Sequence, residues 1–296
     1  MIAVMGATGN IGHVVADELL DAGEEVRVLG RSAERLEPWV RRGAEASTGD
    51  ATDAAYLTRA FQGADAVYAM VPPDYSNPDV SGHYDRVAAA IEHAVRDSAV
   101  KSVVFLSSLG AEHADGTGPI KLLHRAEERL KKVPGVVLLI LRPGFFFENH
   151  LGSIGLIQGK GINGGAIAPD VPIAMTATKD IGVAAAEALC KRDFRGTTVR
   201  ELLGPRDLTM QDATGILGVA IERPDLEYVQ FPYDDYAKAL THAGFSDSVA
   251  QLFAEMAQAM NAGRVRSLEG RNAQNTTPTT LESWAREVFA KAYRAA

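Results

Sequence analysis

The first half of the chain alternates short apolar runs with amphipathic segments, and this alternation restricts the fold more than any other feature. Continuously apolar runs occupy residues 2–5, 66–71 and 136–141, while residues 11–23 space their apolar side chains as one face of a helix. Continuously apolar strands are typical of a parallel sheet that helices cover on both faces. Six strand–helix alternations within about 145 residues therefore predict a doubly wound α/β fold of the Rossmann type, with its ligand site at the carboxyl ends of the strands.

The second half of the chain is less regular. We expect a Gly/Pro-rich loop at residues 159–172 and a polar loop at residues 270–280. Two strands are expected at residues 197–204 and 226–232. Helical regions are expected at residues 179–190, 209–221, 234–262 and 279–293. The sequence thus predicts a dinucleotide-binding Rossmann domain over residues 1–150. A smaller α+β lobe over residues 151–296 is expected to pack on it and to close a substrate pocket.

Composition excludes several classes of partner. The chain has 296 residues, a formal net charge of −8 and a pI of about 5.4, which argues against nucleic acid because phosphate backbones need a basic face. Cys190 is the only cysteine, so no intrachain disulfide can form, and this is typical of a reducing cytosol. No apolar run approaches the roughly 18 residues of a membrane span. We therefore expect a cytoplasmic protein without a membrane partner.

Three glycines, Gly6, Gly9 and Gly12, follow the first apolar run at intervals of three residues. In a strand–turn–helix context this spacing indicates a dinucleotide-binding loop. Gly6 permits the tight turn, Gly9 lets the backbone approach a pyrophosphate, and Gly12 lets the helix pack closely. The N–H groups of Thr8, Asn10 and Ile11, together with that of Gly9, are expected to point at phosphate oxygens, with help from the helix dipole.

The end of the second predicted strand indicates which dinucleotide binds. NAD-binding folds place an Asp or Glu there to hold the ribose 2′-hydroxyl. Here the chain reads Gly30, Arg31, Ser32, and Arg35 follows one helical turn later. A guanidinium can grip a 2′-phosphate and stack on adenine, and Ser32 can add a hydrogen bond or cap the next helix. The sequence predicts NADP in preference to NAD, although Arg31 alone could also be a solvated surface charge.

The later strand ends supply further candidates. After the third strand, Asp50 can accept a hydrogen bond from adenine while Ala51 packs against its ring; Asp53 fits the role of helix N-cap better than Asp50 does. After the fourth strand, Met70, Val71 and Pro72 are expected to line the adenosine and ribose side of the cofactor.

Nearer the reacting end, the fifth strand ends in Ser107 and Ser108, which should lie beside the nicotinamide. Three consecutive phenylalanines follow the sixth strand and must point in different directions. Phe145 is the one expected to face the nicotinamide pocket. The glycine-containing loop at residues 109–119 is expected to be mobile and to cover the cofactor.

The usual catalytic acid of short-chain dehydrogenases is missing. Those enzymes pair a serine with Tyr-x-x-x-Lys, but none of the eight tyrosines here has a lysine four residues later. The helix after the fifth strand offers Lys121 and His124, one turn apart on one face, as alternative catalytic residues. A solvated, salt-paired helix explains the same two residues equally simply. No metal site is expected, because no further ligand has suitable spacing.

These motifs together resemble one family. The segments GATGNIG, VLGRS, GDATD, SSLGAEH, HRAEERL, LRPGFFFEN, TKDIG and TTPTTLESWARE are similar to those of the NmrA-like group of atypical short-chain dehydrogenases. The resemblance implies that Gly6, Thr8, Gly9, Asn10 and Ile11 form the pyrophosphate loop. It also implies that Arg31 holds the 2′-phosphate, and that Lys121 lies near the catalytic lysine of the isoflavone-reductase branch.

The resemblance leaves three activities open. The first is an NADPH-dependent reductase of a small conjugated acceptor such as a quinone or azo compound; a quinone suits a site without an acid, because water can protonate the hydroquinone anion. The second is a non-catalytic NADP(H)-binding sensor with a regulatory protein partner. The third is a biosynthetic reductase or isomerase that uses Lys121. A homodimer is compatible with all three.

Overall fold

The structure, a computed structural model, describes residues 1–296 without a gap. Seven parallel strands form its central sheet in the order β10-β6-β5-β4-β1-β2-β3. The strands span Ile2–Val4 (β1), Val26–Gly30 (β2), Glu45–Thr48 (β3), Ala66–Ala69 (β4), Ser102–Leu106 (β5), Val137–Pro143 (β6) and Thr197–Leu202 (β10). The strand order reverses between β1 and β4, which is where a doubly wound sheet binds its ligand. The predicted fold class is confirmed.

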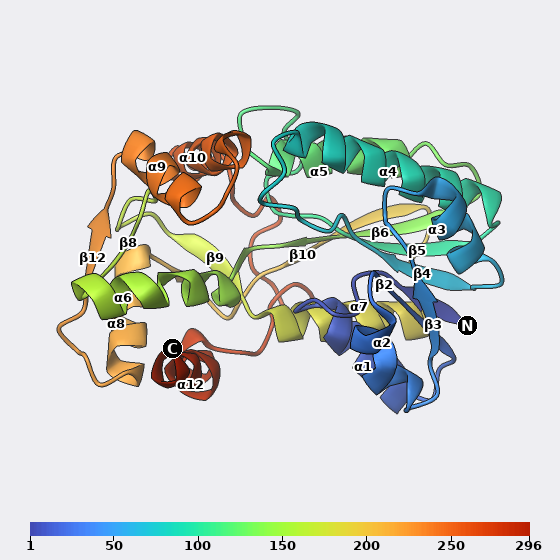
Figure 1. The fold of residues 1–296 in the computed structure, drawn as a ribbon, viewed down its shortest axis with the longest axis horizontal. Coiled ribbons are helices and arrows are strands. Elements are labelled where there is room, and N and C mark those ends of the chain that lie inside the picture. Colours follow the sequence, from blue (N-terminus) through green and yellow to red (C-terminus); the bar gives the residue numbers. More distant parts are fainter.

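Helices cover both faces of this sheet (Figure 1). One face carries Gly12–Asp21 (α1), Ala33–Val40 (α2) and Thr178–Lys191 (α7), and the other carries Ala54–Phe61 (α3), Val80–Asp97 (α4) and Ile120–Leu130 (α5). Strand β5 shows why the strands are apolar throughout: Val103 and Phe105 enter the core beneath α3 to α5, whereas Val104 enters the opposite core. Alternating side chains are thus buried on both sides.

The chain leaves this sheet after β6 and later returns to it. Helix α7 packs beside α1 so closely that a Cβ on Gly182 would lie 2.5 Å from Cβ of Val14. Strand β10 then pairs in parallel with β6 and becomes the seventh strand. Residues 178–202 therefore lie with the Rossmann sheet in space, although they follow the boundary that the sequence predicts at residue 150. A parallel pair needs a long crossover, and here the crossover includes part of the second lobe.

The second lobe has two small sheets, β11-β9-β7 and β12-β8, with helices around them. Its elements are Phe145–Phe146 (β7), a 3-10 segment at Phe147–Ser153, Ile154–Lys160 (α6), Ile162–Gly165 (β8), Ile173–Thr176 (β9), Asp207–Leu208 (β11), Met210–Ala220 (α8), Glu227–Gln230 (β12), Tyr233–His242 (α9), Asp247–Asn261 (α10), Leu281–Trp284 (α11), a π-helical turn at Ala285–Phe289 and Ala290–Ala295 (α12). Phe147, Trp284 and Phe289 are buried at the centre of its core.

Strand β8 lies inside the segment predicted to be a Gly/Pro-rich loop, so that prediction is wrong there. The strand pairs in parallel with β12, and Phe231 packs on its glycine-rich face, where a Cβ on Gly164 would lie 2.5 Å from the ring. Glycine within a strand often marks such a close approach, which a search for β-branched residues misses.

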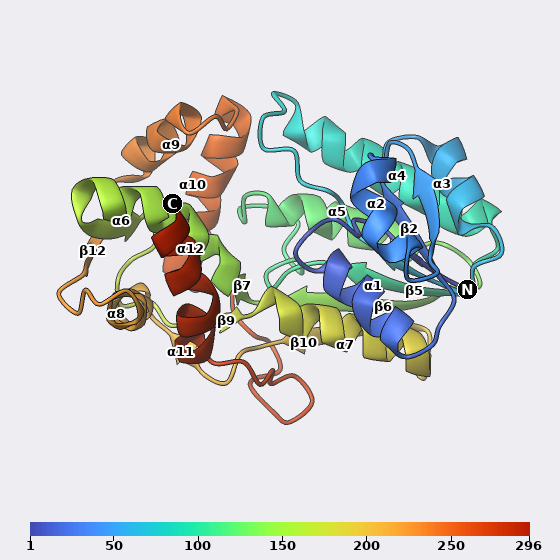
Figure 2. The ribbon, with the colours of Figure 1, turned by 60° about the horizontal axis from the view of Figure 1, so that its bottom comes forward.

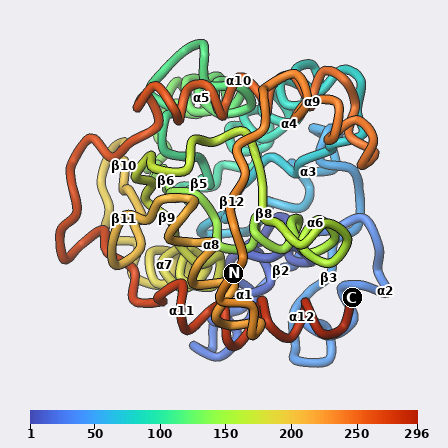
Figure 3. Tube along the Cα trace, turned by 90° about the vertical axis from the view of Figure 1, so that its left-hand side faces the viewer, coloured from blue at the N-terminus to red at the C-terminus, as the bar shows by residue number.

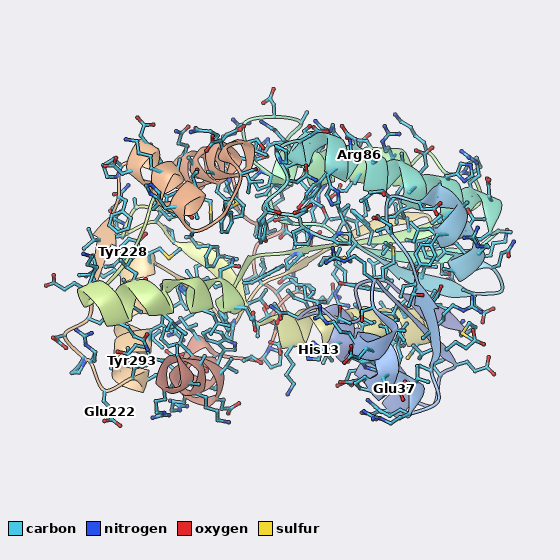
Figure 4. All side chains as sticks on the ribbon, in the orientation of Figure 1. His13, Glu37, Arg86, Glu222, Tyr228 and Tyr293 are labelled. Atoms are coloured by element: carbon cyan, nitrogen blue, oxygen red, sulfur yellow. The ribbon has the colours of Figure 1, made fainter.

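The second lobe faces the carboxyl edge of the large sheet, with α10 next to the start of α5 (Figure 2). Viewed from the second lobe, α9 and α10 lie above its small sheets and α11 and α12 below them (Figure 3). Figure 4 shows His13 near the middle of the molecule, at the end of α1 that faces this lobe, and Tyr228 at the far left, on the outer side of the second lobe. None of the helices combines the length and the hydropathy needed to cross a bilayer.

Candidate active site

A cavity of about 610 Å³ lies between the carboxyl edge of the large sheet and the second lobe. Three parts of the molecule meet in its wall. The glycine loop and start of α1 form one end, α4, α5 and α10 form the other, and β7 and β9 lie between them. The side chains that matter below are Asn10, Met70, Tyr75, Tyr84, Ser107, Ser108, Phe145, Glu148, Asn149, Thr178, Phe253 and Met256.

The glycine loop has the geometry that its spacing predicts. Gly6 has φ +65°, a left-handed conformation that glycine adopts without strain, and its carbonyl accepts a hydrogen bond from the Gly9 N–H at 2.9 Å. A Cβ on Gly12 would lie 2.2 Å from the same carbonyl, so only glycine fits there. The Gly9 amide, expected to bind phosphate, is instead engaged within the turn.

The remaining amides of the loop are available to a ligand. The N–H groups of Asn10 and Ile11 donate to no protein acceptor, and helix α1 has no side-chain cap at its start. Thr8 contributes its carbonyl oxygen to Arg35 at 3.4 Å. These two N–H groups lie at the N-terminus of a ten-residue helix and beside Gly9, which has no side chain, so a pyrophosphate could approach them closely and accept their hydrogen bonds. The phosphate role of these residues stays a prediction.

The tip of β2 carries positive charge and no carboxylate. Arg31 is exposed and forms no hydrogen bond or ion pair with the protein, so its guanidinium is free to meet a phosphate. Ser32 caps helix α2, where its hydroxyl accepts from the Arg35 N–H at 3.4 Å. These residues lie outside the cavity, on the open edge of the sheet beyond the glycine loop.

Asp50 lies in a tight turn close to this edge. Its Oδ1 accepts from the N–H and the hydroxyl of Thr52, both at 2.8 Å, and these hydrogen bonds lower the pKa of the carboxyl below its usual value. Asp50 is therefore a carboxylate with one oxygen left for adenine, and Ala51 packs against the core beside it. Asp53 caps helix α3 through the N–H groups of Ala55 and Tyr56, as predicted.

Two of the three residues expected after β4 line the cavity, and the third does not. Met70 and Val71 line the cavity, and the Met70 sulfur packs against the backbone of Gly6. Pro72 does not line it; its carbonyl oxygen lies 3.0 Å from Nε2 of His83. The expected contact between Pro72 and the cofactor stays a prediction.

Ser107 and Ser108 line the cavity, but their hydroxyl protons are engaged. Ser107 donates to Oε1 of Glu127 at 2.6 Å, and Ser108 donates to the Leu109 carbonyl at 3.0 Å. Glu127 is fully buried and also accepts two hydrogen bonds from Arg142, at 2.9 and 2.6 Å. This buried pair fixes the tip of β5, and sequence reasoning missed it because its members lie on a helix and a strand with no shared motif.

Lys121 and His124 point away from the cavity. Lys121 donates to both oxygens of Glu255 in α10, at 2.9 and 2.8 Å, and Nδ1 of His124 lies 2.8 Å from the Ala111 carbonyl. Neither residue lines the cavity, whereas their neighbours Ile120 and Leu123 do. Their catalytic role stays a prediction. The Lys121 contact ties α5 to the second lobe, and the His124 contact ties α5 to the loop that precedes it.

The loop at residues 109–119 packs against the second lobe. Leu109, Ala111 and Thr117 are buried, and Gly118 lies so close to α10 that a Cβ there would meet the Leu252 carbonyl at 2.1 Å. Leu109 and Pro119 line the cavity, and the expected mobility of the loop stays a prediction.

The end of the cavity under α10 is aromatic and apolar. Phe145 lines it, as expected, together with Phe253 and Met256. Tyr75 and Tyr84 also line it, and sequence reasoning missed both because it examined tyrosines only for a lysine partner. The Tyr75 ring stacks on Phe245, with ring centroids 5.1 Å apart.

Only one charged side chain lines the cavity. Glu148 accepts from the Thr178 N–H at 3.0 Å and from the Trp284 indole N–H at 3.1 Å, so both of its oxygens have partners. No lysine, arginine or histidine lines the wall. The cavity can hold a flat apolar molecule next to a dinucleotide, but it offers no cation to a charged one.

Comparisons with known proteins agree with this geometry. The chain is 33% identical to (4-alkanoyl-5-oxo-2,5-dihydrofuran-3-yl)methyl phosphate reductase of Streptomyces griseus, over 93% of this chain and 94% of that protein. It is 28% identical to quinone oxidoreductase 2 of Escherichia coli, over 86% of each chain. The crystal structure of that NADPH-dependent enzyme with NADPH superimposes with a TM-score of 0.80 at 25% identity, over 98% of this chain and all of the other.

A third similarity concerns the fold alone. The triphenylmethane reductase of Citrobacter sp. superimposes with a TM-score of 0.79 at 19% identity, over 98% of this chain and 99% of that one. The family comparison covers more than the Rossmann sheet, since it matches residues 1–285 and so includes the second lobe. The chain belongs to the NmrA-like family.

Proposed function

We propose that this protein is an NADPH-dependent oxidoreductase that transfers hydride to a small, uncharged, conjugated carbonyl compound such as a quinone. One observation carries the proposal. A single cavity joins the free amides at the start of α1 to an aromatic chamber whose only charged residue, Glu148, already has partners on both oxygens.

The cofactor is NADPH. No carboxylate stands at the tip of β2 to hold a ribose 2′-hydroxyl, while Arg31 is unpaired and Arg35 lies next to the glycine loop. An Arg guanidinium binds a phosphate through charge-assisted hydrogen bonds, so these two side chains favour the 2′-phosphate. The quinone oxidoreductase with NADPH, which shares this fold, supports the same choice.

The apolar wall distinguishes between acceptors. A phosphate ester such as the one named for the Streptomyces griseus relative needs cationic or amide donors when it is buried, since an unpaired buried charge is costly. No cationic side chain lines this cavity, and the free amides of the glycine loop are expected to hold the dinucleotide. The acceptor chamber therefore suits a neutral molecule better than a phosphorylated one.

The chain's own residues contribute orientation and exclusion of water. Bound NADPH supplies the hydride. Phe145, Phe253 and Met256 hold a flat ring and keep water from it, and the buried Glu127–Arg142 pair fixes the tip of β5 beside the reacting atoms. Ser107 and Ser108 have no free proton, so neither acts as the acid. Reduction of a quinone by hydride gives a hydroquinone anion, which takes its proton from water.

The test is steady-state oxidation of NADPH with a panel of neutral quinones, a neutral butenolide and its phosphate ester. We expect turnover with quinones, weaker turnover with NADH, and little with the phosphate ester. Binding of NADPH without turnover of any acceptor would overturn the proposal and would leave the cofactor-binding sensor in its place.

A further inference from the structure

We propose that the Tyr84 hydroxyl is the hydrogen-bond donor that holds the oxygen of the acceptor during hydride transfer. This inference rests on the proposed function and assigns the role of donor to a residue other than Lys121 and His124, which do not line the cavity. The donor comes from helix α4, and Tyr84 is not part of a Tyr-x-x-x-Lys motif.

The position of Tyr84 is the first argument. It lies in the second turn of α4, lines the cavity, and packs against the cluster of Val80, Leu122 and Val249 where α4, α5 and α10 meet. Tyr84 is thus at the end of the cavity opposite the glycine loop. A flat acceptor placed next to the dinucleotide extends from there toward this end.

The state of its hydroxyl is the second argument. The Tyr56 and Tyr228 hydroxyls each donate to a backbone carbonyl at 2.8 Å. The Tyr68 hydroxyl, also in the cavity wall, is fully enclosed and has no partner. The Tyr84 hydroxyl differs from all three, because it has no partner in the protein and yet is not enclosed, so the cavity is where its proton can find an acceptor.

The other side-chain donors in the wall are engaged or lie elsewhere. Ser107 and Ser108 donate to the protein. Asn10 is part of the glycine loop, and Asn149 and Thr178 flank Glu148 on the side of β7 and α7. At the α4–α10 end only the two tyrosines remain. Tyr75 is 46% exposed and stacked on Phe245, so as a whole residue it is more open to solvent than Tyr84, which is partly buried.

The chemistry follows from these surroundings. As hydride forms its bond to the acceptor, the electron pair it brings places negative charge on the acceptor's oxygen, and a donor already aimed at that oxygen stabilises the transition state. Burial raises the pKa of Tyr84 well above its usual value, so the phenol stays protonated at physiological pH. Tyr84 therefore donates a hydrogen bond without giving up its proton, and water protonates the product.

The experiment compares Tyr84→Phe with wild type, with 1,4-naphthoquinone as the acceptor. We expect kcat/KM for the quinone to fall by on the order of 30-fold, mainly in kcat, which is within the range for loss of one charge-assisted hydrogen bond. The ratio between the two enzymes should be constant with pH from about 6 to about 9, because the phenol does not ionise there.

Two readouts separate this role from a structural one. The hydroxyl forms no hydrogen bond with the protein, so Tyr84→Phe should leave the Tm and the NADPH Kd as in wild type. The matched control is Tyr293→Phe, because the Tyr293 hydroxyl also has no hydrogen-bond partner in the protein but lies outside the cavity; it should keep quinone turnover as in wild type. An unchanged kcat/KM in Tyr84→Phe, or an equal loss in Tyr293→Phe, overturns the inference. Failure of wild type to reduce any quinone overturns the proposed function itself.

Discussion

The two ends of the cavity are built in different ways. The glycine-loop end is formed by one continuous segment, Gly6 to Gly12, whose shape depends on the absence of side chains at its three glycines. The acceptor end consists of side chains, and they come from segments far apart in the chain, such as Tyr84 in α4, Phe145 after β6 and Phe253 in α10. The first end can bind only one kind of group, whereas the second can change its ligand by single substitutions.

This difference predicts unequal tolerance to mutation. A side chain added at the backbone end collides with other backbone, which cannot move without breaking the turn. A side chain altered at the acceptor end meets other side chains, which can repack. Substitutions at the first end should abolish cofactor binding, and those at the second should change rates and acceptor choice.

The largest effect is expected for Gly12→Val. Its Cβ would lie 2.2 Å from the Gly6 carbonyl, so the turn must open and the amides of Asn10 and Ile11 must shift. We expect NADPH affinity to fall by more than about 100-fold, which is the effect of losing two charge-assisted hydrogen bonds, measured by fluorescence titration. Gly215→Ala in helix α8, where an added Cβ meets nothing within 4 Å, is the control and should bind normally. Normal NADPH binding by Gly12→Val would show that the glycine-loop end tolerates an added side chain as well as the acceptor end does.

The same difference explains what the sequence could predict. The glycine loop, the strand tips and the absence of a carboxylate after Gly30 depend on neighbours along the chain, so they could be read from spacing. The Ser107–Glu127–Arg142 network and the aromatic chamber depend on how separate elements pack, and no local pattern encodes that. Lys121 shows the limit: its spacing suited a catalytic residue, but its partner, Glu255, is 134 residues away.

The pairing of β10 with the large sheet could not be predicted from the sequence, for a similar reason. The helix at residues 179–190 and the strand at residues 197–204 could both be predicted from their patterns. Their place beside α1 and β6 could not, because it depends on pairing over a long crossover, which leaves no local signal.

The second largest effect is a loss of stability at acid pH, which we expect from a histidine packed behind the aromatic wall of the acceptor end. His150 is buried behind Phe145, with ring centroids 5.6 Å apart, and its Nε2 has no partner. Burial lowers the pKa of His150 to about 4, against roughly 6.5 in an unfolded chain. Protonation thus favours unfolding, and the free energy of unfolding should fall by about 3 kcal/mol as the pH drops from about 6.5 to about 4.

Urea unfolding at several pH values measures this dependence. His150→Phe should have a flatter profile over that interval, whereas His93→Gln, at an exposed histidine, should follow wild type. Carboxylates whose pKa is lowered in the fold, such as Asp50, lose their stabilisation from about pH 5 downward, and wild type and His150→Phe share this contribution, so the difference between the two profiles reports the imidazole. Parallel profiles for wild type and His150→Phe would mean that the imidazole is not the acid-sensitive group.

A smaller effect is expected at the adenosine edge. Arg31→Ala removes an exposed guanidinium that has no protein partner, so the fold should be unchanged. The Kd for NADPH should rise by about 10- to 50-fold, as expected for a charge-assisted phosphate contact, while the Kd for NADH stays constant. Titration with both nucleotides measures the preference. An equal loss for NADH and NADPH would show that Arg31 contacts adenine or the pyrophosphate instead of the 2′-phosphate.

The smallest effect is expected for Lys121→Met, and it tests the alternative reading of this helix. Lys121 is partly exposed and forms a surface ion pair with Glu255, a type of contact that is worth at most about 1 kcal/mol. Because its ammonium lies outside the cavity, quinone turnover and NADPH affinity should both stay within about threefold of wild type. Glu255→Gln removes the same pair from the other lobe and should give the same small change in Tm. If Lys121→Met loses turnover while Glu255→Gln keeps it, the lysine acts in the reaction. The second lobe must then move α10 far enough for Lys121 to exchange its carboxylate partner for the substrate.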